Sequence, residues 1–179
     1  MGILYVILAV LIITVFWGII VTNSFKRMLV KITESESGID VSLTKRYDTL
    51  TKLMEVVKAY TKHEAGLFEK VIQFRSGMSM SEKNQANQSM NEAARGLIAV
   101  AENYPELKSS DNYKQLQTSI VEVEDHLQAA RRVYNMNVSS LNQGIAVFPN
   151  SIAAKLGKFT SREFFEAEEI KRADVKINL

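Results

Sequence analysis

The chain has 179 residues, a one-domain length, and its 22 Lys and Arg residues nearly balance its 20 Asp and Glu residues. A net charge of +2, with no dense block of Lys and Arg, excludes a protein that coats nucleic acid. Because the chain has no cysteine, disulfides, thiolate nucleophiles and zinc–thiolate sites are excluded. No charged residue falls within positions 1–25, so an apolar leader precedes a polar body.

The leader contains an apolar stretch, GILYVILAVLIITVFWGIIVT, at residues 2–22. This exceeds the roughly 20 residues that a helix needs to cross a bilayer. A cleaved signal peptide would have a basic start and a shorter apolar core, and a myristoylation signal would need Ser or Thr at Val6. A buried core helix would rarely stay uncharged for so long. We therefore expect residues 1–25 to form a transmembrane anchor that contacts the lipid bilayer through residues 2–22.

The expected orientation follows from the cations beside the stretch. Lys26, Arg27 and Lys31 come directly after it, in a basic and polar juxtamembrane segment, 26–38. Loops on the cytoplasmic side of a membrane are enriched in Lys and Arg. The sequence therefore predicts a single-pass protein with its N-terminus outside and its body in the cytoplasm.

Apolar residues at helical spacing predict a first body helix over 39–74. Within each of two neighbouring rows, the apolar residues are spaced by seven or a multiple of seven. One row holds Leu43, Leu50, Val57 and Val71, and the other holds Leu53, Tyr60, Leu67 and Phe74. Two charges, Arg46 and Glu64, interrupt this face. Either both snorkel at its edge, or each meets an opposite charge on a neighbouring helix and fixes the register.

Two further helices are expected before Pro149. The second is capped by Ser81, leaves Lys83 exposed and ends before Pro105, with a turn at 106–110. Its apolar seam comprises Ala86, Met90, Ala93, Leu97, Val100 and Tyr104. The third is capped by Ser110 or Asp111, and its seam comprises Tyr113, Leu116, Ile120, Val123, Leu127, Ala130, Tyr134, Val138, Leu141, Ile145 and Phe148.

No segment shows two-residue alternation, so the predicted fold class is all-α. We expect an N-terminal transmembrane helix, then an elongated antiparallel three-helix bundle of coiled-coil type over 39–149. A short helix closed by a left-handed Gly157 and a C-terminal tail should occupy 150–179. Phe164 and Phe165 of the tail must pack on the bundle or on a partner.

The sequence offers little support for catalysis. His63 lacks the second histidine of a zinc-protease helix, His126 lies off the apolar seam, and no glycine-rich phosphate loop is present. We therefore expect no cofactor, metal site, catalytic residue or small-molecule substrate. A polar ridge of Arg131, Asn135 and Asn142 is either an ordinary flank of the third helix or a set of hydrogen-bonding groups for a facing segment.

Four separated motifs resemble those of the bacterial LemA family. They are KRYDTL with VVKAYTKHE (45–64), ENYPELK (102–108), AARRVYNMNV with SLNQGIAVFP (129–149) and FFEAEE (164–169); Leu141 departs from the Tyr that the family often has there. The resemblance implies a membrane-anchored helical bundle without an agreed biochemical activity. It directs attention to Tyr134, Asn135, Asn142, Phe148 and Pro149 as structural or partner-contacting positions.

The expected function is that of a non-enzymatic scaffold or interaction protein of the bacterial cytoplasmic membrane, and a membrane signalling module is the alternative. Possible partners are copies of the same chain and other envelope proteins, not nucleic acid. Val56, Ala59 and Ile72 lie outside the seam of the first body helix, so apolar surface is left for a homo-oligomer.

Overall fold

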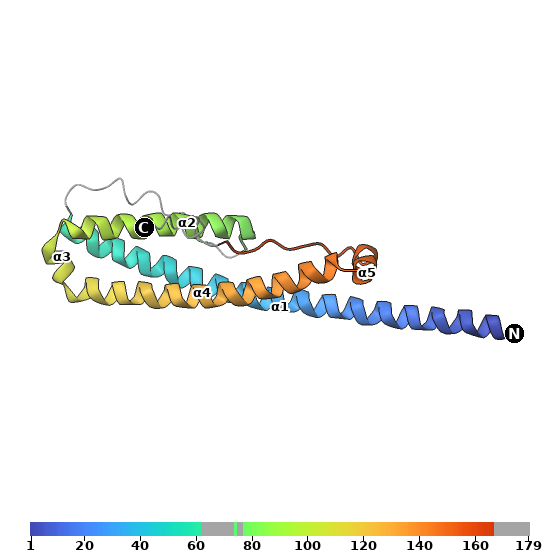
Figure 1. Cartoon of the computed structure of the whole chain (residues 1–179). Helices are drawn as coiled ribbons and strands as arrows, with labels where there is room; N and C mark the ends of the chain where they lie inside the picture. Colours follow the sequence, from blue (N-terminus) through green and yellow to red (C-terminus); the bar gives the residue numbers. More distant parts are fainter. Residues whose placement is uncertain (62–73, 75–76, 167–179) are drawn as a thin grey trace, which may run out of the picture. The chain divides into compact units, whose positions relative to one another are not determined.

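A computed structural model describes residues 1–61, 74 and 77–166, and within these ranges every regular element is an α-helix. The helices in chain order are α1 (Gly2–Tyr60), α2 (Met80–Glu102), α3 (Pro105–Ser109), α4 (Asp111–Ala146) and α5 (Asn150–Leu156) (Figure 1). The expected all-helical class is confirmed for the described residues.

The chain divides into two compact units. Unit 1 comprises Met1–Glu36 and Val133–Glu163, and unit 2 comprises Ser37–Arg132 and Phe164–Leu179. Each unit therefore takes part of α1 and part of α4. The boundaries expected from the sequence (1–25, 26–38, 39–149 and 150–179) separate a membrane segment from a body, and they stay a prediction.

Helix α1 runs for 59 residues without a break. Its polar stretch after the apolar leader is helical, and hydroxyl groups there are satisfied by carbonyls of the preceding turn: Thr33 donates to Leu29, and Ser35 to Lys31. A buried row at seven-residue spacing also continues through this stretch, at Phe25, Ile32 and Ile39. The leader and the first body helix are thus one element.

Unit 2 has a core to which four helices contribute. Its buried members are Leu50, Leu53 and Val57 of α1, Ala86, Met90, Leu97, Val100 and Ala101 of α2, Leu107 of α3 and Tyr113 of α4. The seams expected for the three long helices largely supply these residues. Val56, expected to lie outside the seam of α1, instead packs against this core.

The direction of α2 differs from the expected antiparallel bundle. Contacts of Asp40 with Lys83, and of Arg46 with Asn87 and Asn91, advance together along both helices, so α1 and α2 run parallel. Helix α4 runs antiparallel to α1 in unit 2, since Gly38 lies near Ala130 and Arg46, further along α1, contacts the earlier Glu124. Short connections produce antiparallel neighbours, but nineteen residues (61–79) separate α1 from α2. The coiled-coil character of the packing stays a prediction.

Several helix ends also differ from expectation. Helix α1 ends at Tyr60, not near Phe74, and the Tyr60 side chain is exposed. Residues 62–73, which include Glu64, lie outside the described residues. Helix α2 begins two residues earlier than expected, because Ser79 and Glu82 cap each other: the Glu82 amide donates to Ser79 Oγ, and Glu82 Oε2 accepts from the Ser79 amide.

The first turn of α2 contains a second correction, because Lys83 is fully buried rather than exposed. The expected turn after Tyr104 is a short helix, α3, with Pro105 at its first position. Ser110 caps α4 as expected, since its hydroxyl accepts from the Tyr113 amide.

Helix α4 ends at Ala146, two residues before the end of the expected seam. Pro149 disfavours helical geometry at the preceding residue, so Phe148 leaves the seam and is exposed. In α5, Gly157 closes the helix with a negative φ, and the left-handed residue is Lys158 (φ 54°). Phe165 is buried, whereas Phe164 is largely exposed.

The apolar leader contributes little to the packing of the chain. By length and composition α1 contains a segment able to cross a membrane, and none of that segment is buried within the protein. Fourteen of its large apolar side chains lie outside any core until Val21 and Phe25, which are buried. An exposed apolar surface of this extent needs a partner or a non-aqueous surrounding.

Candidate functional site

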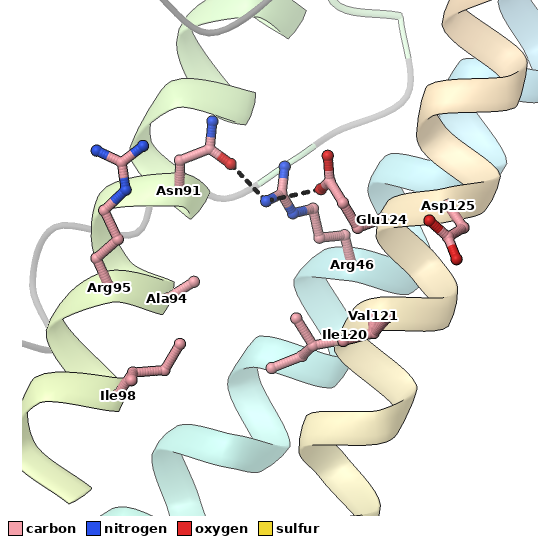
Figure 2. A pocket seen from close by; sticks show the side chains of 9 residues that line it. All are labelled: Arg46, Asn91, Ala94, Arg95, Ile98, Ile120, Val121, Glu124 and Asp125. Carbon is pink, nitrogen blue, oxygen red and sulfur yellow. Dashed lines mark hydrogen bonds and ion pairs between the residues drawn. The ribbon is translucent and has the colours of Figure 1, made fainter. Parts of the chain in front are cut away.

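The centre of unit 2 holds a buried cation, Arg46, in the apolar seam of α1. It continues the seven-residue row of Phe25, Ile32 and Ile39, and its side chain is 7% exposed. One guanidinium nitrogen donates to Asn87 Oδ1 and the other to Asn91 Oδ1, both on α2. Figure 2 shows the guanidinium between Asn91 and Glu124, which lie on α2 and α4. Arg46 therefore joins the three long helices of unit 2.

The charge of Arg46 is balanced from α4. Its Nη2 lies 3.0 Å from Glu124 Oε2, an oxygen that accepts no well-oriented hydrogen bond within the part of the chain that the structure describes. The contact is thus chiefly electrostatic. The other oxygen, Glu124 Oε1, accepts a 2.5 Å hydrogen bond from Gln128 one turn later. Of the two alternatives for Arg46, pairing with an opposite charge on a neighbouring helix is confirmed.

A second charged pair lies nearby between α1 and α2. Lys83 Nζ approaches Asp40 Oδ1 to 2.6 Å, and the lysine side chain is 2% exposed. A buried ammonium needs an opposite charge, because its loss of hydration is costly. The Asp40–Lys83 pair fixes the height of α2 along α1, and the Arg46–Glu124 pair fixes that of α4. They contribute to specificity of packing more than to its strength.

Beside Arg46, the surface of unit 2 is hollowed into an open pocket of about 290 Å³. The residues lining it come from α1, α2 and α4: Arg46, Asn91, Ala94, Arg95, Ile98, Ile120, Val121, Glu124 and Asp125 (Figure 2). Its cations and carboxylates largely neutralise each other. The apolar part of the wall, notably Ile98 and Val121, is exposed to solvent.

Unit 1 contains a second polar arrangement, which binds the backbone of the segment after α5. Asn142 makes two hydrogen bonds to Arg162, donating to its carbonyl and accepting from its amide, each 2.9 Å long. The Tyr134 hydroxyl donates to the Glu163 carbonyl at 3.0 Å. Two positions singled out from the sequence thus grip extended backbone as an adjacent strand would.

The phenol of Tyr134 is kept neutral in this arrangement. Its burial, and then the nearby carboxylate of Glu36, raise its pKa to about 12, although Arg162 acts in the opposite direction. On the same helix Asn137 donates to the Lys31 carbonyl and to Ser35 Oγ, each at 3.2 Å. Helices α1 and α4 of unit 1 are therefore joined by side-chain amides as well as by apolar packing.

Unit 2 repeats this type of grip with Asn84. Its amide nitrogen donates to the Phe164 carbonyl at 3.3 Å, and its Oδ1 accepts from the Glu166 amide at 3.0 Å. Phe165, between these two residues, is buried. The sequence analysis missed Asn84, which lies in a polar stretch with no apolar periodicity. An asparagine among helix-forming residues was the one available signal.

The remaining candidates from the sequence take different positions. Arg131 and Asn135 are both half-buried, Arg131 in unit 2 and Asn135 in unit 1. Asn142, also in unit 1, makes the hydrogen bonds to Arg162 described above. Phe148 and Pro149 are exposed after α4. His126 is exposed, and His63 lies outside the described residues. Within the described ranges, no group of three His, Asp or Glu side chains gathers as metal ligands would.

The fold and these sites define a class of protein. It is helical, its N-terminal helix carries an exposed apolar segment, and its polar side chains bond to neighbouring helices and to the backbone of the C-terminal segment. The sequence model of the LemA family matches residues 35–179, most of the chain. The chain therefore belongs to the LemA family.

Two curated relatives show how far the likeness extends. The protein named Protein LemA from Metamycoplasma hominis is 31% identical over 96% of this chain and 81% of its own length. The magnetosome protein MamQ 2 of Paramagnetospirillum magneticum is 39% identical, but over 39% of this chain and 26% of its own length. The second likeness is local.

Arg46→Met should lower the free energy of unfolding by roughly 2–4 kcal/mol, because it leaves Glu124 and two asparagine oxygens without their donor. Adding Glu124→Leu should recover part of this loss, since it removes the unpaired carboxylate. The measurement is urea unfolding of the full-length protein in mild detergent, followed by circular dichroism. Lys45→Met, at the exposed neighbouring position, is the control and should change stability by less than about 0.5 kcal/mol. Equal losses at positions 45 and 46 would contradict the assigned network.

Tyr134→Phe should cost roughly 0.5–1.5 kcal/mol near neutral pH, through loss of the hydrogen bond to Glu163. A tyrosine whose pKa is raised to about 12 in the folded protein stabilises it fully below the unfolded pKa of about 10. That contribution is lost as the pH rises through 12. The stability difference between wild type and variant should therefore shrink between about pH 10 and 12. A stability difference for Tyr134→Phe that stayed constant over this pH range would refute the raised pKa.

Proposed function

We propose that the protein is a membrane-anchored helical scaffold of the bacterial cell envelope that acts through contacts rather than catalysis. The observation that carries this proposal is the continuity of α1. One helix contains an apolar segment with no burial inside the chain and, further on, the buried seam of the unit 2 core. Such a helix would fix a bundle directly to the bilayer without a flexible linker.

The burial pattern of α1 favours an anchor over the other origins of an apolar helix. A core helix of a water-soluble protein would be covered by its neighbours, whereas this segment is exposed. A cleaved signal peptide would end at a small-residue site, but here Phe25 and Ile32 bury their side chains soon after the segment. Its removal would leave these packed turns as a frayed end.

The polar groups of the described residues support a role in contacts. Arg46, Lys83 and Asn84 bond to other helices or to backbone, and Tyr134 and Asn142 do the same in unit 1. These side chains are engaged in structure, and a catalytic group has to be available to a substrate. This is why we prefer a scaffold to an enzyme.

We further propose that the body lies in the cytoplasm and the N-terminus outside. Lys26, Arg27 and Lys31 are exposed on α1 directly after the apolar segment. Lys and Arg residues that flank a membrane-spanning helix favour the cytoplasmic side. Because the native chain has no cysteine, single cysteines can report the two sides separately.

The test uses Gly2→Cys, where an added side chain meets no other atom, and Gln88→Cys at an exposed position of α2. A membrane-impermeant maleimide should label Gly2→Cys on intact cells. It should label Gln88→Cys only after the cells are lysed. Both proteins should stay in the membrane after carbonate extraction. Labelling of Gln88→Cys on intact cells would refute the orientation, and release by carbonate would refute the anchor.

The same continuity favours a second candidate function, a signalling module. An unbroken helix between a span and a core could transmit a rotation or shift to unit 2. Co-purification from native membranes would distinguish the two functions. A fixed envelope partner supports the scaffold, and a regulatory enzyme supports signalling.

Self-association in the membrane is a further part of the proposal. Confinement to a plane raises the effective concentration of weak contacts. Of the features that the sequence suggested for this contact, Val56 and Phe165 pack within the chain, so exposed Val121 and Ile98 at the pocket of unit 2 are the better candidates. Val121→Glu should weaken cross-linking between copies in native membranes, whereas exposed Glu122→Gln should not. Absence of cross-linked dimers in the wild type would exclude self-association.

A further inference from the structure

Unit 1 exposes a group of large apolar side chains just after α4. They are Val147, Phe148, Ile152 and Leu156, between 48% and 81% exposed. Helix α5 thereby inverts the usual pattern of a surface helix, because it buries small Ala153 and Ala154 and exposes Ile152 and Leu156. We call these four side chains the apolar foot.

The foot lies level with the inner end of the apolar segment of α1. An added Cβ at Gly144 would come within 3.0 Å of the Phe25 ring, so α4 closely approaches α1 there. After α5, the ring of Phe159 lies 5.0 Å from that of Phe25, centroid to centroid. Phe25 follows the segment 2–22 by three residues, or roughly 5 Å along the helix. Gly144 before the foot and Phe159 after it therefore both lie against Phe25, close to the point where α1 would leave the bilayer.

The charge of unit 1 suits the surface of an anionic membrane. Exposed cations lie near the foot on two segments of unit 1: Lys26 and Arg27 on α1, and Lys155 and Lys158 in and just after α5. Unit 1 carries six Lys and Arg against three acids, and two of those acids, Glu34 and Glu36, lie at least two turns further along α1 from Phe25. Bilayers with acidic lipids attract cations placed within a few ångströms of their surface.

We propose that the apolar foot is a second membrane contact, in which α5 and the residues before it rest on the anionic bilayer surface beside the span. The occupant is lipid: the four apolar side chains enter the boundary between headgroups and acyl chains, and the four cations meet acidic headgroups. The inference rests on the proposed anchoring of α1. It adds a contact that would restrain the tilt and rotation of the span, as interfacial side chains do.

Tryptophan fluorescence of the full-length protein can test the foot and the anchor separately. Trp17 is the single tryptophan of the chain and lies in the apolar segment. The protein is placed in vesicles of phosphatidylethanolamine and phosphatidylglycerol whose acyl chains carry bromine, a quencher of tryptophan emission. Native Trp17 reports the anchor, and Phe148→Trp or Leu156→Trp in a Trp17→Phe chain reports the foot.

The matched control is Met136→Trp in the same Trp17→Phe chain. Met136 lies on α4, is 61% exposed like the foot, and comes eight residues before Gly144, roughly 12 Å along the helix. Helix content of all variants is compared by circular dichroism, so that a fluorescence change from misfolding is recognised.

We expect Trp17 to be quenched. We also expect the emission of Phe148→Trp and Leu156→Trp to be quenched at least about twofold more than that of Met136→Trp. Quenching of Trp17 with both foot positions equal to Met136→Trp would overturn the foot and leave the anchor standing. Unquenched Trp17 would overturn the anchor, and the foot with it.

Two further outcomes decide the chemistry of the contact. In brominated phosphatidylcholine alone, foot quenching should fall, and an unchanged value would overturn the role of acidic lipid. A blue-shifted but unquenched foot tryptophan would mean that protein covers it, as in an interface with a second copy, and would overturn the lipid contact.

Discussion

Burial of the Arg46 charge in the seam of α1 is the constraint that orders unit 2. A guanidinium in an apolar row is tolerated only if its charge and donors are met, and the partners come from two other helices. Sliding α2 by a turn would leave Arg46 with at most one of its two asparagines, which are themselves one turn apart, and sliding α4 would separate it from Glu124. The apolar core around Leu50 and Leu53 supplies most of the stabilisation, whereas Arg46 selects one alignment among several that such seams allow.

Unit 1 is organised by a different interaction, the gripping of backbone by side-chain amides and a phenol. Asn142 satisfies both polar groups of Arg162, and Tyr134 satisfies the carbonyl of Glu163. An extended segment has no hydrogen bonds of its own, so such donors replace those that a neighbouring strand would supply. In unit 2, Asn84 does the same for Phe164 and Glu166 while Phe165 fills the core. All of these residues lie within the range that matches the sequence model of the LemA family.

The apolar surfaces of the protein sort by position. Most exposed apolar residues of α1 precede Val21, although Val30 and Val41 are also exposed, and a second group lies after α4 in the foot near Phe25. Both surfaces belong to unit 1, which also carries the excess of cations, whereas unit 2 is close to neutral. This distribution fits the proposed anchoring of α1 in an anionic membrane.

The sequence by itself determined the helical class and most of the buried seams, because helix formation and burial of one face follow from local spacing. Local spacing predicted the apolar segment 2–22 and the seams through Leu50, Met90 and Leu127. It also predicted that the second helix of the body ends before Pro105. Local spacing also marked Asn142, since polar groups beside a seam need partners, and the resemblance to the LemA family marked Tyr134. Neither could show what those partners were.

Tertiary structure alone decided the long-range relations. The parallel direction of α2 depends on which surfaces meet after a connection of nineteen residues, and no periodicity encodes that choice. Lys83 was expected to be exposed, but it is buried against Asp40 of α1. Phe148 fits the spacing of the α4 seam, but the helix ends before it, at Ala146. Each of these outcomes depends on contacts between residues far apart in the chain, or on competition between such contacts and local preference, and a pattern read along one helix does not contain them.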